Sequence, residues 1–237
     1  MHLFVTPGPE WFSGPDFIVD LVSVLVLLLI GFFSWKYYII DKTKKHLHLF
    51  VAMVILGISF LFKIFTYFLL YLTTFNVQIY QTLGRLIYYV EPSNFYFSIA
   101  FITYSLLTLI GFFILYSIYE QNISIKTTIL TLYFMLALAI FSENAYIFMH
   151  LTALILTLMI AHSLWRNCKK NKLKSTMWLA TSFLILSISR IFFILANLNP
   201  SMYVLGELIQ LFGYIILLLI FISVLQHGKK KGKNTNN

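Results

Sequence analysis

Charged residues are scarce in this chain of 237 residues: they make up 11% of it, whereas 60% of the residues are hydrophobic. A water-soluble domain needs a polar surface, and this composition has too few polar side chains to provide one. The mean hydropathy of +0.86 points the same way. We therefore predict a multi-pass protein of the cell membrane, with nearly all of the chain within or beside the lipid bilayer.

Other absences exclude several kinds of chemistry. Cys168 is the one cysteine, so no intrachain disulfide can form. The sequence has no His-Glu-x-x-His zinc motif, no Gly-x-Ser-x-Gly motif, no phosphate-binding loop and no Cys-x-x-Cys pair. His150 and His162 lie roughly 18 Å apart along one predicted helix, too far to bind one metal ion together. We expect no metal site and no cofactor, and no motif indicates an enzyme.

Acidic residues are outnumbered by basic ones, 8 to 17, which gives a net charge of +9. We do not expect a nucleic-acid partner, because the basic residues stand at the ends of apolar runs rather than on one folded face. Fourteen of the 17 occur in the segments 36–45, 126, 166–174 and 229–233. Such a distribution is typical of cytoplasmic loops and tails, which we expect to attract anionic lipid at that face.

Seven apolar segments are long enough to cross about 30 Å of hydrocarbon as helices. They are 17–40, 48–72, 95–119, 125–142, 145–166, 174–197 and 202–226. The positive-inside rule then places the N-terminus outside and the C-terminus in the cytoplasm. The predicted fold class is therefore an all-α polytopic bundle of seven transmembrane helices over 17–226, with an external tail at 1–16 and a basic cytoplasmic tail at 227–237.

Three pairs of short matches indicate an internal repeat. They are "SWK" (34–36) with "LWR" (164–166), "FKIF" (62–65) with "SRIF" (189–192), and "LIGFFIL" (109–115) with "LFGYIIL" (211–217). The matches keep the same order, which predicts two parallel three-helix repeats, about 17–119 and 145–226, around a linker helix at 125–142. Convergent patterning of interfacial aromatic and basic residues, with glycine at helix contacts, is the alternative.

In this layout the chain resembles the broad group of seven-helix proteins that includes SWEET sugar transporters, microbial rhodopsins and G-protein-coupled receptors. It is most similar to small uncharacterised seven-helix proteins of archaea with a lysine in the second helix and a "GELIQLFGY"-like last helix. The last span has no lysine for a retinal Schiff base, and no Pro-Gln pair occurs. "YEQ" (119–121) stands where receptors have Asp-Arg-Tyr. The resemblance therefore implies an architecture and carries no function.

Ionisable side chains at membrane depth are the candidates for function, because a charge there is costly. Lys63 is the only charged residue in the apolar run 49–72, and Arg190 matches it in the sixth span. Apart from Lys63, near the midplane, the candidates fall in the outer half of the predicted bundle. The candidate residues for a ligand site or a buried ion-pair network are Lys63, Arg190, Glu207, Asp20, Glu143, His150 and Gln210.

Three interpretations of these residues stay open. The first is a sensor or receptor-like protein that binds a small anionic ligand in a charged pocket open to the outside, with a cytoplasmic protein partner or anionic lipid at the basic loops. The second is a small-solute or proton-coupled transporter, with a polar route past Gln210, Tyr214, Thr157 and His162. The third is a purely structural network that fixes helix packing. An apolar inner half of the bundle would count against transport.

Overall fold

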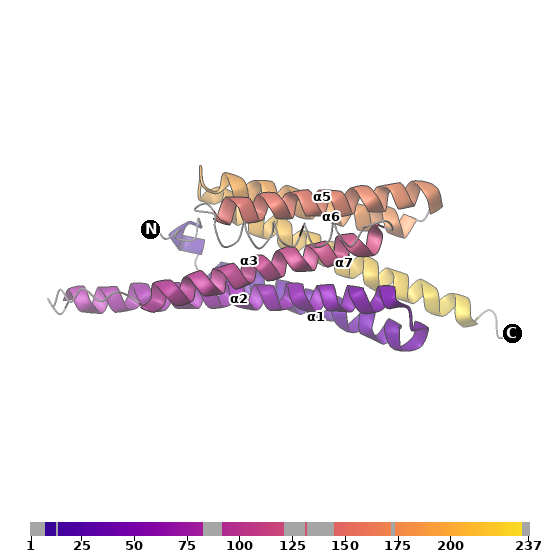
Figure 1. The fold of residues 1–237 in the computed structure, drawn as a ribbon, viewed down its shortest axis with the longest axis horizontal. Coiled ribbons are helices and arrows are strands. Elements are labelled where there is room, and N and C mark those ends of the chain that lie inside the picture. The colour runs from indigo at the N-terminus through magenta and orange to yellow at the C-terminus, as the bar shows by residue number, and fades with distance from the viewer. Residues whose placement is uncertain are drawn as a thin grey trace.

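The described part of the chain consists almost entirely of long helices. The computed structural model describes residues 8–12, 14–82, 92–120, 131, 145–171 and 174–233. After a short 3-10 helix, η1 (Glu10–Phe12), come α1 (Pro15–Asp41), α2 (Lys44–Thr82), α3 (Pro92–Tyr119), α5 (Ala145–Asn171), α6 (Lys174–Leu195) and α7 (Ser201–Lys233). The helices lie side by side in one elongated bundle (Figure 1).

Six of the described helices are long and apolar enough to cross a membrane, which fits the predicted all-α, multi-pass character. The predicted seven-helix topology is wrong, because length and hydropathy identify six spans rather than seven in the residues that the structure describes. The expected fourth span, 125–142, lies outside the described residues apart from Thr131. In the described chain, α1 begins at one end of the bundle and α7 finishes at the other (Figure 1).

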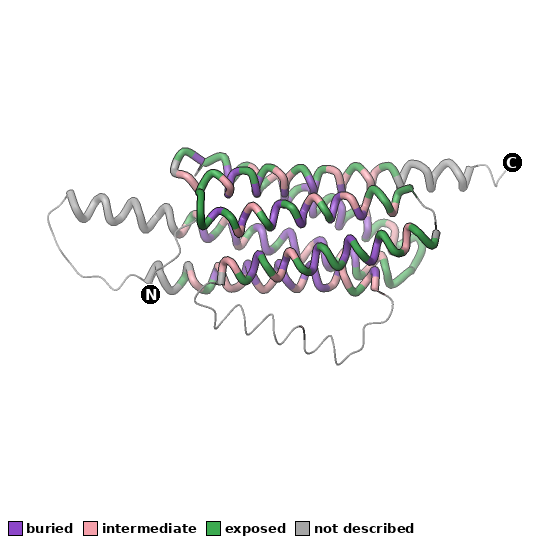
Figure 2. The backbone as a smooth tube through the Cα atoms, turned by 90° about the horizontal axis from the view of Figure 1, so that it is seen from above, coloured by how far each residue is buried: buried purple, intermediate pink, exposed green. Residues whose placement is uncertain are grey.

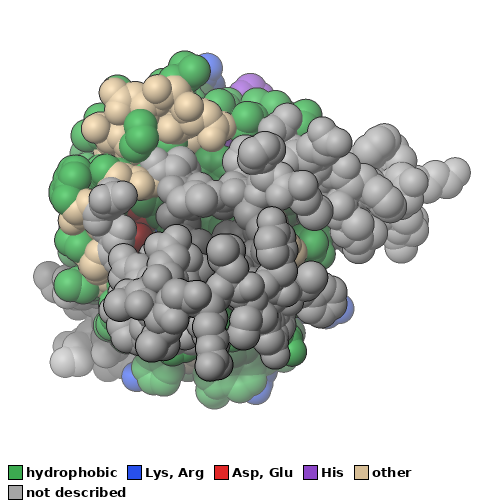
Figure 3. Space-filling model, turned by 90° about the vertical axis from the view of Figure 1, so that its left-hand side faces the viewer, with side chains coloured by type: hydrophobic (Ala, Val, Ile, Leu, Met, Phe, Trp, Pro, Cys, Tyr) green, Lys and Arg blue, Asp and Glu red, His purple; other side chains and the backbone are tan. Residues whose placement is uncertain are grey.

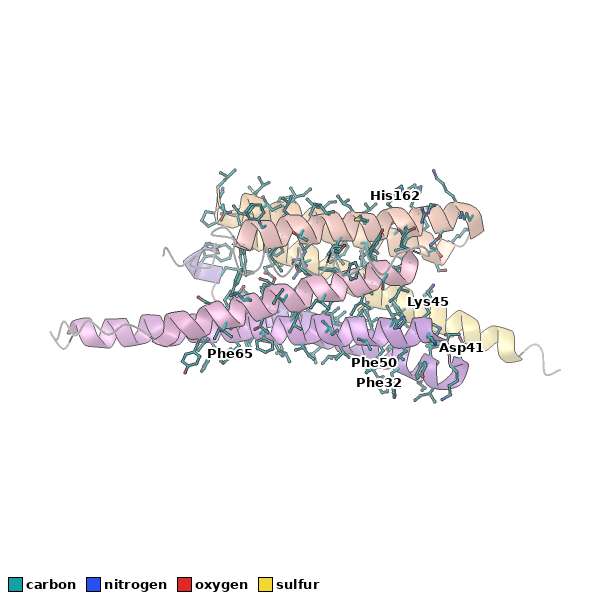
Figure 4. All side chains as sticks on the ribbon, viewed as in Figure 1. Phe32, Asp41, Lys45, Phe50, Phe65 and His162 are labelled. Atoms are coloured by element: carbon teal, nitrogen blue, oxygen red, sulfur yellow. The ribbon has the colours of Figure 1, made fainter. Side chains whose placement is uncertain are left out.

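The helices pack in an order that closes a ring. Consecutive helices α1, α2 and α3 pack together, as do α5, α6 and α7, and the two groups meet where α3 packs on α5 and α1 packs on α7. Buried positions face the interior of the bundle and exposed positions face outward (Figure 2). Phe32 and Phe65 are among the large apolar side chains that point away from the bundle (Figure 4). Such an apolar exterior suits contact with lipid.

The two ends of the bundle differ in chemistry. The turn between α1 and α2 lies at the same end of the bundle as the last residues of α5 and the first residues of α6, and Asp41 and Lys45 are labelled there in Figure 4. Glu120, just after α3, accepts hydrogen bonds from Ser163 and Arg166 of α5, so α3 also ends there. We call this the basic end. We call the opposite end the site end, because the buried charged side chains lie toward it.

Two glycines allow close contact between neighbouring helices. A Cβ atom at Gly111 of α3 would lie 2.6 Å from Cγ of Leu56 of α2, and one at Gly213 of α7 would lie 2.8 Å from Cδ2 of Leu186 of α6. Each contact joins the second and third helices of one predicted repeat. The repeat itself stays a prediction, and these paired contacts are of the kind that it requires.

The chain before α1 packs on the site end. Phe12 of η1 is buried beside Phe193 and Tyr203, with its ring 6.3 Å from the Tyr203 ring. A Cβ atom at Gly8 would lie 2.9 Å from the same tyrosine ring. Part of the segment predicted as an external tail therefore contributes to the packing of the bundle.

Replacing Gly111 by alanine is expected to cost more stability than replacing Gly31, although both substitutions favour helix equally. The nearest side-chain atom to a Cβ at position 31 is 3.5 Å away, an ordinary contact, whereas Leu56 must move at position 111. We expect Gly111→Ala to be less stable than Gly31→Ala by about 1–3 kcal/mol, the usual cost of overpacking. Unfolding by SDS, followed by tryptophan fluorescence, measures the difference, and equal stabilities would contradict the close approach.

Candidate functional site

Lys63 is the centre of a buried ion-pair cluster that joins three helices. Its ammonium donates a hydrogen bond of 2.8 Å to Oδ1 of Asp20 on α1 and another to Oε1 of Glu207 on α7. The side chains of both carboxylates are fully buried, and that of Lys63 is 8% exposed. One ammonium group is therefore shared by two carboxylates. We call these three residues the Lys63 clamp.

The environment of the Lys63 clamp is otherwise aromatic. The rings of Phe60, Tyr67, Phe193 and Tyr203 have their centroids 5.5–5.9 Å from the ammonium nitrogen, close enough for cation–π attraction. The hydroxyls of Tyr67 and Tyr203 are hydrogen-bonded to each other. The aromatic side chains therefore surround the clamp and connect α2, α6 and α7 around it.

Carboxylates outnumber Lys63 at this point of the bundle. Asp16, one turn before Asp20, is also buried. Oδ2 of Asp20 and Oε2 of Glu207 have no hydrogen-bond partner among the described residues. Figure 3 views the molecule from the site end, and an acidic side chain is visible there among hydrophobic and other described atoms. Lys63 is thus fully neutralised by the protein itself.

Arg190 of α6 has a very different environment. Its side chain is completely buried, yet Nε and Nη2 have no partner among the described residues. Nη1 lies 3.5 Å from Nδ1 of His150, which is long for a hydrogen bond. The guanidinium carbon lies 5.4 Å from the ring centroid of Phe112 and 5.6 Å from that of Phe193. Within the described chain, Arg190 is therefore a buried cation without a carboxylate.

More unpaired polar groups occur on the two helices beside Arg190. Both amide atoms of Gln210 and the hydroxyl of Tyr214, on α7, are buried without a partner in the described chain, as are the hydroxyls of Ser105 and Thr108 on α3. Buried polar groups in native proteins almost always have a partner. The interior faces of α3 and α7 therefore offer hydrogen-bonding capacity that the described side chains leave unused.

The structure brings most of the predicted site residues together. Lys63, Asp20 and Glu207 form the clamp, His150 contacts Arg190, and Gln210 is buried on α7. Glu143 lies outside the described residues. Sequence reasoning missed the aromatic neighbours, because aromatic residues make up 18% of the chain and no pattern separates those in the site from those facing lipid.

His150 packs between two aromatic rings, one on its own helix α5 and one on α6. It stacks on Phe193 with a centroid distance of 4.7 Å and an interplanar angle of 22°. The Tyr146 ring meets it edge-on at 4.4 Å. Phe193 therefore stacks on His150 and lies within cation–π distance of both Arg190 and Lys63.

The predicted polar route past Thr157 and His162 is interrupted. Thr157 is hydrogen-bonded to Ser187 at 2.9 Å, whereas His162 is exposed on the outer side of α5 (Figure 4). Ser34 and Ser182, deeper toward the basic end, donate to carbonyls of their own helices. The other buried side chains there are largely apolar: Leu27, Ile30, Leu49, Ala52, Met53, Leu56, Leu115, Ile160, Leu164, Ala180, Phe183 and Leu217.

A separate ion pair lies at the basic end. Arg166 donates to both carboxylate oxygens of Glu120 at 2.7 and 2.8 Å, and Ser163 donates at 2.8 Å. The hydrogen bonds from Arg166 and then Ser163 lower the pKa of Glu120 below its ordinary value of 4.5. Sequence reasoning used Glu120 only as a landmark, since a glutamate after an apolar run has no distinctive pattern.

Comparison with known proteins gives no relative to reason from: no family model, curated protein or solved structure matches the chain. The resemblance to seven-helix proteins stays a prediction. The geometry of the Lys63 clamp and of Arg190 is therefore the basis for function.

Removing the charge of Lys63 is expected to destabilise the bundle strongly. Lys63→Met leaves two buried carboxylates without a cation, and breaking a buried ion pair costs about 3–5 kcal/mol. Lys36→Met, at an exposed position, is the matched control. In SDS unfolding, the triple variant Lys63→Met with Asp20→Asn and Glu207→Gln should recover most of the loss. A single variant as stable as the control would contradict the clamp.

The Glu120–Arg166 pair is expected to contribute stability at neutral pH and to lose it in acid. Because the pKa of Glu120 is lower in the folded protein, its stabilising effect is complete above the ordinary value of 4.5 and disappears as the pH falls through the folded pKa. Glu120→Gln should therefore be less stable than the natural chain at pH 6, and this difference should vanish in strong acid. Thermal unfolding at both pH values tests this, and a difference independent of pH would contradict it.

Proposed function

We propose that this protein is a receptor-like, multi-pass protein of the cell membrane that binds a small anion at Arg190, within the site end of the bundle. One observation carries the proposal. Arg190 is completely buried with Nε and Nη2 unpaired among the described residues, whereas Lys63 is shared by two carboxylates. The Lys63 clamp is then the structural part of the site, and Arg190 is the part that receives the ligand.

The chemistry of arginine supports this division. A guanidinium group stays protonated in proteins, so Arg190 cannot escape the cost of burial by losing its proton. An unpaired buried charge costs several kcal/mol. A bound anion removes that cost, and hydrogen bonds to a charged group contribute about 1.5–3 kcal/mol each. Arginine is also the preferred side chain for binding oxyanions through two parallel hydrogen bonds.

The contacts of Phe193 suggest how binding at Arg190 affects the Lys63 clamp. Its ring lies 5.6 Å from the guanidinium carbon of Arg190 and 5.9 Å from the ammonium nitrogen of Lys63. The Lys63 clamp holds α1 and α7 against α2. A ligand that changes the position of Arg190 therefore acts on the residue that also contacts the clamp. At the basic end, lysines lie in the turn between α1 and α2, in the last turn of α5 and at the start of α6. They are suited to an anionic lipid or a cytoplasmic protein partner.

The apolar character of the bundle beyond the site favours binding over transport. In the described chain, the buried side chains between Tyr214 and the basic end are mainly aliphatic or aromatic. The hydroxyls of Ser34 and Ser182 there are bonded to their own helices, and that of Ser163 is bonded to Glu120. His162, required by the predicted route, faces outward. The polar side chains that a solute would meet beyond Arg190 in the described interior, such as Thr157, Ser182 and Ser34, are already hydrogen-bonded within the protein.

Anion binding is expected to raise the melting temperature of the natural chain in a saturable way. The purified protein is titrated with acetate, phosphate or chloride at constant ionic strength, and the Tm is recorded. Arg190→Gln should abolish the rise, and its Tm without anion should equal or exceed that of the natural chain, because an unpaired buried charge has been removed. Arg166→Gln, which removes an exposed arginine, should keep the rise.

Two outcomes would contradict the proposal. If no anion raises the Tm and Arg190→Gln lowers it as much as Lys63→Met does, Arg190 is part of a purely structural network. If proteoliposomes pass radiolabelled acetate at a rate that Arg190→Gln abolishes, the protein is a transporter. We expect no such flux.

A further inference from the structure

The three sequence matches define a register between the two halves of the bundle. Aligning "SWK" (34–36) with "LWR" (164–166) places Asp20 at the position of His150. Aligning "FKIF" with "SRIF" places Lys63 at the position of Arg190, and aligning Gly111 with Gly213 places Ser105 at the position of Glu207. Both residues that neutralise Lys63 therefore have uncharged counterparts in the other half.

The contacts in the structure agree with this register. Lys63 is bonded to Asp20 at 2.8 Å, and Arg190 approaches His150 at 3.5 Å. The first-helix register was read from residues some four turns away from Asp20 and His150, so these two contacts are an independent check on it. In each half, the cation of the second helix meets the same position of the first helix.

Each cation also contacts the third helix of the opposite half. Lys63 receives Glu207 from α7, the third helix of the opposite half. Arg190 likewise contacts the third helix of its opposite half, α3, through Phe112. On that helix the position of Glu207 is occupied by Ser105, whose hydroxyl is buried without a described partner. The Arg190 site thus corresponds to the Lys63 clamp without its two carboxylates.

We propose that the anion bound at Arg190 is a carboxylate, which takes the place that Asp20 and Glu207 occupy around Lys63; this inference rests on the proposed function. The free groups Nε and Nη2 lie on one edge of the guanidinium, and this edge accepts both oxygens of a carboxylate. Serine is shorter than glutamate and has no charge, so the ligand's carboxylate takes the place of the missing one. Phe112 and Phe193 provide apolar contact for its alkyl group.

A carboxylate can reach Arg190 from two sources, the aqueous phase or the bilayer, and a panel of anions separates them. The Tm of the natural chain is titrated with acetate, propionate, octanoate, chloride and phosphate at constant ionic strength. We expect at least one carboxylate to raise the Tm at concentrations tenfold or more below those that chloride and phosphate need. If only acetate or propionate raises the Tm, the ligand is a water-soluble acid. If only octanoate raises it, the ligand is a fatty acid from the membrane.

The same panel separates the two proposals. If all anions raise the Tm equally and Arg190→Gln abolishes the rise, the proposal of anion binding stands and the proposal that the anion is a carboxylate is overturned. If no anion raises the Tm, both proposals are overturned. Glu143→Gln is tested in parallel. If this variant loses stability and gains an acetate response that the natural chain lacks, the counter-anion of Arg190 is the protein's own carboxylate and the inference is wrong.

Installing the missing carboxylate provides a second test, with no ligand needed. Ser105→Glu is compared with Ser105→Gln, which has the same size and no charge. We expect the glutamate variant to melt at a higher temperature than the glutamine variant and to lose the acetate response, because Arg190 is then neutralised internally. His150→Asp, compared with His150→Asn, repeats the test if the first pair does not fold. A charged variant that is no more stable than its control and still responds to acetate would overturn the inference.

Discussion

A single buried ammonium shared by two carboxylates organises the site end of this protein. Lys63 of α2 bonds to Asp20 of α1 and to Glu207 of α7, and all three side chains are removed from solvent. Separating any one of these charges from its partners would leave an uncompensated charge in a nonpolar medium. The clamp therefore fixes how α1 and α7, from opposite ends of the chain, meet α2.

Because Lys63 is neutralised internally, the second cation decides what the site can do. Arg190 has the same buried setting, with His150 where Lys63 has Asp20, and no carboxylate among the described residues. The two halves of the bundle thus differ in charge balance although their helix contacts correspond. The cation of the first half is neutralised by Asp20 of its own half and by Glu207 of the other half. The second half is left with a fixed positive charge that no described carboxylate neutralises.

The depth of the charged residues could be predicted from the sequence, but their pairing could not. Hydropathy placed Lys63, Arg190 and Glu207 inside spans, and acidic partners for the two cations were expected. Which way each side chain points depends on the rotation of its helix in the bundle, and apolar runs with little amphipathic pattern do not define it. For this reason His162 was expected in a polar route and is exposed. The span count differs for another reason: the expected fourth span, 125–142, lies outside the described residues apart from Thr131, and six spans are identified in the described chain.

The most direct test of the account is to locate an anion in the bundle. Crystals of the natural protein are soaked with bromoacetate, whose bromine is identified by anomalous scattering. The account predicts a bromine peak beside Arg190, with the carboxylate within hydrogen-bonding distance of Nε and Nη2, and Lys63 still bonded to Asp20 and Glu207. A protein carboxylate seated on Arg190, or bromoacetate bound at Lys63 in place of its carboxylates, would contradict it.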